Sequence, residues 1–308
     1  MITVLAGGVG GSKFIHGLSL LDITNSVAII NTGDDIEKFG LYVSPDIDIN
    51  IYRLANVIHE QGWGFEGDTY QFQEILSTIY QEDCWFNLGD KDIATHIYRS
   101  NLLKEGYSLS EITQKMCEKF NTNIAILPMS NNPVSTYVDT PDGEYHFQEY
   151  LIKRRMSDKV HSIKLAGIEE ALPAPGVLEA INESSIIFIA PSNFYVSINP
   201  ILSIPGVREA IKNSNAKVIG ISPIIGGNAV KGPLAKMMKD FNVEISPYGV
   251  AQLYDGLLDG FIIDHQDHDC KADIQNLDIS VLTTNTILDT EEQKETLIRE
   301  ALLFVENL

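Results

Sequence analysis

The sequence predicts an α/β fold: a doubly wound, Rossmann-like and mostly parallel sheet with a helical insertion covering the site. Two observations predict this class. First, an apolar stretch at residues 2–5 leads through a glycine loop at 7–13 into a helical stretch at 14–21, and a second apolar stretch follows at 27–30. Strand, loop, helix and strand in this order form a βαβ unit, which builds parallel sheets. Second, these strands are continuously apolar, which is typical of strands covered on both faces.

Later segments extend the same pattern. Further strands of this kind are predicted at residues 124–127, 186–189, 217–221 and 260–264, with helical segments at 207–213 and 235–241. Alternating apolar and polar residues, with Asp142-Gly143 at the turn, predict a β-hairpin over about 134–150. The region from about 50 to 120 lacks such strands and shows helical patterns at 49–59, 69–79, 94–103 and 109–120. We expect a helical insertion within one domain spanning residues 1–308.

Composition excludes several classes of function. The 308 residues carry 22 Lys+Arg and 42 Asp+Glu, a net charge of −20. Nucleic-acid binding and docking on anionic lipid both need clustered cations, so we expect neither partner. No apolar run approaches the roughly 20 residues that span a membrane, and no signal peptide is recognisable. Three widely spaced cysteines, Cys84, Cys117 and Cys270, favour a reduced, cytoplasmic protein. An anionic substrate would then require a local positive site.

Four polar or glycine-rich loops follow predicted strands directly, at residues 7–13, 31–35, 191–193 and 222–227. In a doubly wound sheet, ligands bind outside the carboxyl ends of the strands. Because all four loops belong to that edge, they predict one shared ligand site.

The glycine loop is a candidate phosphate site formed by Gly8, Val9, Gly10, Gly11 and Lys13. It is not a Walker motif, and it does not complete Gly-x-Gly-x-x-Gly, because Lys13 occupies the third glycine position. It does offer backbone N–H groups at a helix N-terminus together with one Lys, a combination that binds phosphate. The alternative is a tight turn that packs the strand against the helix.

Asp46 and Asp48 are candidate ligands for Mg²⁺, since they lie two residues apart just ahead of a predicted helix. In an extended or turn backbone such residues point the same way, and Mg²⁺ prefers hard oxygen ligands. Helix N-capping is the alternative. Asp34 and Asp35 form a weaker version of this pair, and one of them is expected near a ribose or in a supporting position.

One face of a predicted helix carries Asp92, His96 and Arg99 at three- and four-residue spacing. These residues either line a site or form a solvated helix start with ion pairs. Trp63 and Trp85 either stack on a flat ring or are buried in the insertion.

In this order, the segments resemble the 2-phospho-L-lactate transferase family (CofD/FbiA) of coenzyme F420 biosynthesis. The resemblance runs from the Gly7–Lys13 loop to residues 249–251. It is carried by residues 31–35, 44–48, 88–92 with 94–96, 128–130, 191–193 with 200–202, and 222–226 with 231–233, the last group including Lys231.

The resemblance implies a reaction in which the ribityl hydroxyl of the deazaflavin Fo attacks a guanosine diphosphate ester of lactate or enolpyruvate, so that GMP leaves. It implies Mg²⁺ as cofactor, and it assigns Asp48 to Fo binding and catalysis and Asn87 to a second Fo contact. Lys91 or Arg99 is expected to offset charge on the transferred group, with Lys91 as a catalytic candidate, and Arg99 is also a candidate contact to Fo. The nucleotide is expected to meet the glycine loop and a further set of residues, namely Asn31, Thr32, Asp34, Ser192, Asn193, Ser222, Pro223 and Gly226.

Ile49, Phe194 and Asn199 depart from the family pattern and bear on which three-carbon acid is carried. Base rates favour a homodimer. The alternative function is a regulatory protein of the gluconeogenesis-factor-like family that binds a nucleotide sugar. The 44–48 and 88–92 segments together favour the transferase.

Overall fold

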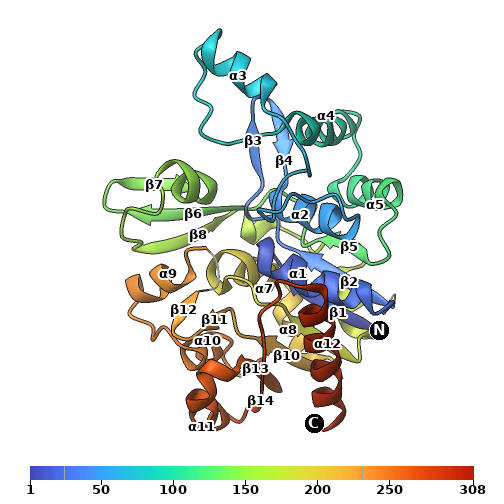
Figure 1. Ribbon diagram of the computed structural model, residues 1–308, viewed down its shortest axis with the longest axis vertical. Helices are drawn as coiled ribbons and strands as arrows, with labels where there is room; N and C mark the ends of the chain where they lie inside the picture. The colour runs from blue at the N-terminus through green and yellow to red at the C-terminus, as the bar shows by residue number, and fades with distance from the viewer. Residues whose placement is uncertain (24, 230–231) are drawn as a thin grey trace.

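A seven-stranded parallel sheet forms the centre of the molecule (Figure 1), as seen in a computed structural model that describes residues 1–23, 25–229 and 232–308. The expectation placed on Lys231 therefore lies outside the described residues. The strand order is β14-β13-β10-β9-β1-β2-β5, and every neighbouring pair is parallel. The strands are β1 (Ile2–Ala6), β2 (Ser26–Ile30), β5 (Ala125–Pro128), β9 (Ile186–Ile189), β10 (Lys217–Ile221), β13 (Gly260–Asp264) and β14 (Ser280–Thr284). This confirms the predicted fold class.

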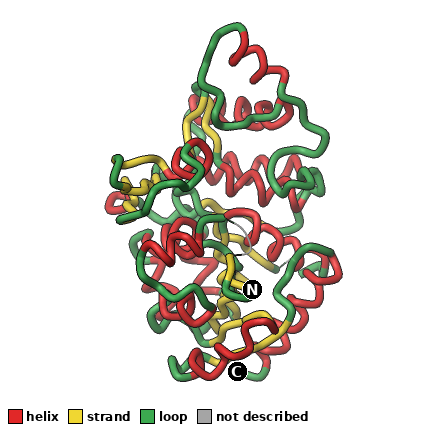
Figure 2. The backbone as a smooth tube through the Cα atoms, turned by 60° about the vertical axis from the view of Figure 1, so that its left-hand side comes forward, coloured by secondary structure: helices red, strands yellow, loops and turns green. Residues whose placement is uncertain are grey.

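Helices cover both faces of the sheet, as the continuous apolar strands require. Successive side chains of a strand point to opposite faces, and so Val4 and Leu5 of β1 belong to two different buried clusters. The first face is covered by α1 (Gly8–Leu20) and α12 (Glu291–Glu306). The other face is covered by helices that include α6 (Val177–Glu183), α8 (Val207–Asn213) and α10 (Pro247–Leu253). In Figure 2, helices flank the strands in the lower half of the molecule.

The chain between β2 and β5 forms a helical layer above the sheet (Figure 1). A short hairpin of β3 (Ile36–Lys38) and β4 (Leu41–Val43) leads into α2 (Pro45–Leu54). The layer continues through α3 (Gln71–Thr78), α4 (Asp90–Lys104) and α5 (Leu109–Phe120). Only α5 has its predicted bounds, because Ser108 and Glu111 form a capping box at its start and Asn121 adopts a left-handed conformation at its end.

The helix predicted at 49–59 begins four residues earlier, at Pro45, and ends at Leu54. Proline is favoured in the first helical turn because its missing N–H would be unpaired there. Asn56 ends the segment with a positive φ of 56°. Asp46 and Asp48 therefore lie within the first turn of α2 and not ahead of it.

The predicted hairpin is confirmed as β6 (Ser135–Thr140) and β7 (Gly143–His146). A third strand, β8 (Ser162–Ala166), pairs with the other side of β6 and was not predicted. The short β-strands and α-helices not yet named are β11 (Ile224–Ile225), β12 (Asn228–Ala229), α7 (Asn199–Ser203), α9 (Leu234–Asp240) and α11 (Lys271–Gln275).

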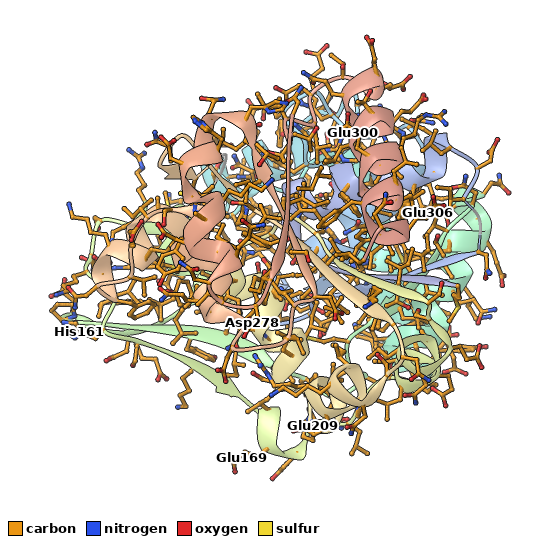
Figure 3. The ribbon with its side chains drawn as sticks, turned by 90° about the horizontal axis from the view of Figure 1, so that it is seen from below. His161, Glu169, Glu209, Asp278, Glu300 and Glu306 are labelled. Carbon is orange, nitrogen blue, oxygen red and sulfur yellow. The ribbon has the colours of Figure 1, made fainter. Side chains whose placement is uncertain are left out.

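Figure 3 places Glu169, Glu209 and Glu306 at the periphery, and all three are exposed. Such carboxylates are solvated and contribute to the net charge of −20 without acting on the interior. Among the residues described, no helix has both the length and the apolar character needed to cross a bilayer.

Candidate active site

A cavity of about 530 Å³ lies between the carboxyl edge of the sheet and the helical layer. Its floor contains loops that follow β1, β9 and β10, and its far wall comes from the helical layer. The predicted residues that line it are Gly8, Val9, Gly10, Lys13, Asp34, Asp46, Asp48, Asn87, Ser192, Asn193, Ser222 and Pro223. The others, which do not line it, are Gly11, Asn31, Thr32, Lys91, Arg99 and Gly226. All four predicted loops therefore contribute predicted residues to the lining, and the 31–35 loop does so through Asp34 alone.

The glycine loop turns directly from β1 into α1 and packs against the loop after β9. A Cβ added to Gly10 would lie 2.2 Å from the Pro191 carbonyl oxygen, so that position accepts only glycine without movement. Gly8 has a φ of +66° and donates its N–H to Asp46 Oδ1 at 2.7 Å. Behind the loop, Gly11 approaches Ala6 and Ser192. The loop therefore forms the tight turn that packs β1 against α1, and it also brings backbone amides to the edge of the cavity.

Lys13 carries the only cation of the glycine loop, and it lines the cavity. Its Nζ atom lies 2.6 Å from Asp289 Oδ1 in the loop between β14 and α12. That loop also lines the cavity through residues 286–289. The sequence pattern did not reveal this wall because polar residues make β14 look unlike the other strands of the sheet.

Asp34 and Asp46 form a close pair of buried carboxylates on the cavity wall. One amide nitrogen, Asn31 Nδ2, donates to both, at 3.3 Å to Asp34 Oδ1 and 2.9 Å to Asp46 Oδ2. Burial raises the pKa of Asp46 to about 6, against the opposing hydrogen bonds from Asn31 and Gly8. Burial, followed by the charge of Asp46, raises the pKa of Asp34 well above its usual value.

These two carboxylates have hydrogen-bond donors but no cationic side chain as partner within the described part of the chain. That part also contains no group of three or more His, Cys, Asp or Glu side chains arranged to hold a metal. Mg²⁺ commonly binds through only one or two carboxylates and completes its coordination with water and substrate phosphates. The Asp34–Asp46 pair fits this kind of site.

Asp48 points elsewhere, which corrects the expectation that it faces the same way as Asp46. In a helix, side chains two positions apart diverge, whereas in an extended backbone they align. Asp48 instead forms an ion pair with the fully buried Arg99 of α4. Both guanidinium Nη atoms contact the carboxylate, and Nη1 donates to Oδ2 at 3.1 Å. Burial by itself would lower the pKa of Arg99, but the charge and hydrogen bond of Asp48 outweigh this effect and raise that pKa above its usual value, so Arg99 stays charged.

The predicted face of α4 is buried, not solvated. His96 is 1% exposed, and its Nδ1 lies 3.4 Å from Arg99 Nη1 while its Nε2 lies 3.5 Å from Asp92 Oδ2. Asp92 Oδ1 accepts a hydrogen bond from the Tyr52 hydroxyl at 2.7 Å. We call this part of the cavity the insertion end, lined by Asp48, Tyr52, Trp63, Phe86, Asp92 and His96. It joins carboxylates to aromatic surface.

Lys91 lies outside the cavity, and its Nζ donates to the Glu66 carbonyl at 2.7 Å. The surrounding segment links α3 and α4, because an aspartate near the start of each helix caps the other helix. Asp68 accepts from the backbone N–H of Lys91 and of Asp92 at the start of α4, and Asp90 accepts from the N–H of Gln71 and of Phe72 at the start of α3. Asn87 lines the cavity, with its Oδ1 bound by Gln73 Nε2.

Comparison with known proteins assigns the family. A family model described as 2-phospho-L-lactate transferase CofD matches residues 2–301. The chain belongs to the CofD family. It is 40% identical, over 100% of its length and 99% of the relative's, to a phosphoenolpyruvate transferase of Streptomyces griseus. It is 38% identical, over 95% of its length and 96% of the relative's, to a 2-phospho-L-lactate transferase of Methanosarcina mazei.

A crystal structure of a Bacillus halodurans protein shares the fold, with a TM-score of 0.64 at 17% identity over 98% of each chain. Membership of the CofD family makes this chain a transferase, and it places the cavity described above in an enzyme. The family resemblance in the sequence is thereby confirmed.

Behind the site of this CofD protein lies Asp35, a buried acid that accepts hydrogen bonds from Ser44 Oγ at 2.7 Å and the Tyr42 hydroxyl at 2.8 Å. Burial raises its pKa to about 8 from a usual value of 3.8. A raised carboxyl pKa contributes stability that is complete below the unfolded pKa and is lost as the pH rises towards the folded pKa.

We therefore expect Asp35→Asn, which mimics the protonated form, to gain stability relative to wild type between pH 5 and pH 8. The gain is at most about 1.4 kcal/mol per pH unit and levels off above the folded pKa. Urea unfolding of both proteins across this range measures it. A difference that does not change with pH would contradict the assignment.

Proposed function

We propose that this enzyme transfers a phosphorylated three-carbon acid from a guanosine diphosphate ester to the ribityl hydroxyl of the deazaflavin Fo, releasing GMP, in the biosynthesis of coenzyme F420. The observation that carries the proposal is a single cavity with two different ends. Glycine-loop amides and Lys13 line one end, and the Asp48 carboxylate with aromatic side chains lines the other. The first suits a diphosphate and the second suits a ring that carries hydroxyl groups.

The proposed step is an attack of the acceptor hydroxyl on the phosphorus atom that carries the three-carbon acid. The new P–O bond forms as the bond to the GMP oxygen breaks, and the hydroxyl proton passes to the departing phosphate of GMP. Catalysis of this kind depends mainly on positioning and charge neutralisation. Asp48, held by Arg99, is positioned to accept a hydrogen bond from the hydroxyl and to orient it. Orientation suffices here, because a carboxylate is a weak base for an alcohol.

The acid carried is lactate or enolpyruvate, because relatives covering almost the whole chain bear both names. The direct test is to mix the protein with Fo, Mg²⁺ and each guanosine diphosphate ester and to measure GMP and the phosphodiester product. We expect GMP release that depends on Fo and is faster with one of the two esters. Absence of GMP with both esters would refute the proposal.

We further propose that Mg²⁺ is the cofactor and that Asp34 and Asp46 hold it, instead of Asp46 and Asp48. The support is the arrangement of the two buried carboxylates, which lack a cationic partner among the described side chains and adjoin the glycine loop. When bound there, Mg²⁺ neutralises charge on the diphosphate. Asp48 is already neutralised by Arg99.

This assignment predicts the effect of Mg²⁺ on stability. Mg²⁺ with GDP is expected to raise the unfolding free energy of wild type by about 2.7 kcal/mol at ligand concentrations near one hundred times the dissociation constant. Asp46→Asn should lose at least the Mg²⁺-dependent part of that gain. The matched control is Glu37→Gln, an exposed carboxylate on β3 that should behave like wild type. An undiminished Mg²⁺ effect in Asp46→Asn, measured by thermal unfolding, would contradict the site.

A further inference from the structure

The segment that follows β13 lies between two walls of the cavity without lining it. In the sheet, β13 is placed between β10 and β14. The loop after β10 lines the cavity through Ser222 and Pro223, and the loop after β14 lines it through residues 286–289. Residues 264–270, which the structure describes throughout, contribute nothing to the lining. Any effect of this strand end on the site must therefore pass through its two neighbours.

Asp267 fixes the loop after β10. Its carboxylate is buried, and its Oδ2 accepts a hydrogen bond from the Gly226 N–H at 3.0 Å. Burial raises the pKa of Asp267, whereas the backbone N–H groups of Gly226 and Gly227 act in the opposite direction. Both glycines have a positive φ, 57° and 72°, and consecutive amides in such a turn form a concavity that suits an anion. The Gly226 amide, predicted to meet the nucleotide, is therefore bound by a carboxylate of the protein itself.

Asp264, the last residue of β13, fixes the loop after β14. It is buried, and its Oδ2 accepts hydrogen bonds from the Thr286 N–H at 2.9 Å and the Thr286 hydroxyl at 3.3 Å. Its Oδ1 accepts from the Gln266 N–H at 3.0 Å. Further along the same loop, Asp289 pairs with Lys13 at 2.6 Å. Asp264 is therefore connected through one short loop to the cation of the glycine loop.

The two aspartates extend the order of the sheet into its loops. β13 pairs in parallel register with both β10 and β14. Beyond the strand ends, buried backbone amides need other acceptors. Asp267 supplies one on the side of β10, and Asp264 supplies one on the side of β14. Because both walls are bound to the same segment, this segment sets the separation between them. A site held in its binding geometry before the ligand arrives binds more tightly.

We propose that Asp264 and Asp267 are positioning residues of the donor site, which hold the walls after β10 and β14 so that a guanosine diphosphate fits between them, and that Asp264 also places Lys13 through Asp289. This inference rests on the proposed function, because it takes the donor to occupy the part of the cavity lined by the glycine loop. It adds that donor affinity depends on two carboxylates that do not line the cavity, whereas acceptor binding at the insertion end does not.

The test compares equilibrium binding of GDP, by calorimetry, with binding of Fo, by its fluorescence. Asp264→Ala and Asp267→Ala are each expected to weaken GDP binding by about tenfold or more and to change Fo binding by less than about threefold. Asp267→Asn keeps an oxygen that can accept from Gly226 and should restore most of the affinity. During turnover, Asp267→Ala should raise KM for the guanosine diphosphate ester and leave kcat nearly unchanged.

Asp259→Ala is the matched control. Asp259 directly precedes β13, at the opposite edge of the sheet, and its Oδ2 accepts a hydrogen bond from the Val218 N–H at 2.8 Å. The variant removes the same kind of hydrogen bond next to the same strand, but away from the cavity. Its GDP affinity should therefore equal that of wild type.

A double-mutant cycle tests the connection to Lys13. Lys13→Ala by itself should weaken GDP binding by about tenfold. Its additional effect should be much smaller in Asp264→Ala, because the loop that holds Lys13 through Asp289 is already released. In Asp267→Ala the two effects should multiply, because Asp267 acts on the other wall and independent sites are additive in free energy.

The inference is overturned if both alanine variants bind GDP as tightly as wild type, if Asp259→Ala weakens GDP equally, or if Fo binding falls in step with GDP binding. Independent effects of Lys13→Ala and Asp264→Ala would overturn the connection through the loop after β14. Asp264→Asn, which keeps one acceptor oxygen, takes the place of Asp264→Ala if that variant does not fold, and wild-type GDP affinity in it would contradict the role.

The same measurements separate the inference from the proposed function. If wild type binds no GDP, the proposed function fails along with the inference. If wild type binds GDP and the Asp264 and Asp267 variants bind it equally well, only the positioning role fails.

Discussion

Asp48→Ala is expected to abolish transfer and also to destabilise the protein by about 3–5 kcal/mol. The loss of transfer follows because Asp48 is the carboxylate proposed to orient the acceptor hydroxyl. The loss of stability follows because Arg99 is fully buried, and both of its Nη atoms contact Asp48. Removing the carboxylate leaves an uncompensated charge in the interior.

A double variant separates the two effects. Asp48→Leu combined with Arg99→Met replaces the buried ion pair by apolar side chains, a change that is often neutral or stabilising. We expect this protein to unfold near the wild-type denaturant midpoint and to remain inactive. Asp83→Ala is the matched control, because it breaks an exposed ion pair between Asp83 and Lys153 at the surface. It should change neither the stability of the protein nor its transfer activity. Urea unfolding and GMP release measure the two quantities. Asp48→Ala with more than a tenth of wild-type turnover would contradict the role of Asp48.

The central sheet could be predicted because its signal is local. Continuous apolar stretches and the glycine loop identify β1, α1 and β2 before any tertiary contact is known. The strand β14 escaped because Ser280, Thr283 and Thr284 interrupt its apolar pattern, and an edge strand can carry them. The cavity wall at residues 286–289, which follows β14, was missed for the same reason.

The carboxylates of α2 show why site geometry is harder to predict than site location. The sequence singles out Asp46 and Asp48 as candidate site residues, and both line the cavity. Their directions depend on where the helix begins, and a shift of its start from 49 to Pro45 turns them apart. Asp46 then joins Asp34, a pairing across 12 positions that depends on how β2 and α2 pack and has no signature in the sequence.

Lys91 presents a different case, because the structure places it outside the cavity. A lysine between two aspartates looks like a catalytic cation, but its direction is set by a contact with the Glu66 carbonyl, 25 positions away. Of the two flanking aspartates, Asp90 caps α3 and Asp92 lines the cavity, whereas the lysine ties the start of α4 to the loop that precedes α3. The direction of such a side chain depends on tertiary packing, and it cannot be predicted from the spacing of residues along the chain.

Gly10→Ala is expected to disrupt the part of the cavity lined by the glycine loop more than any other single-methyl change in that loop. The new Cβ would lie 2.2 Å from the Pro191 carbonyl oxygen, which is backbone and cannot rotate away as a side chain would. The two loops also cannot separate freely, because β1 and β9, which lead into them, are paired in register in the sheet. We expect a destabilisation of about 3 kcal/mol from overpacking. We also expect at least a tenfold weaker affinity for GDP, because the displaced amides would no longer face the phosphates that we propose they bind.

Gly40→Ala is the matched control for Gly10→Ala. It lies in the β3–β4 turn with a φ of +71°, and a Cβ there has no atom within 4 Å. Its cost is therefore the strain of a left-handed alanine alone, about 1–2 kcal/mol, and GDP binding should be unaffected. Urea unfolding and GDP titration of the two variants separate the effect of the close contact between the loops from the general cost of replacing a glycine by alanine. If Gly10→Ala bound GDP as tightly as Gly40→Ala, the glycine loop would not be the phosphate site, and the donor would have to bind elsewhere along the carboxyl edge of the sheet.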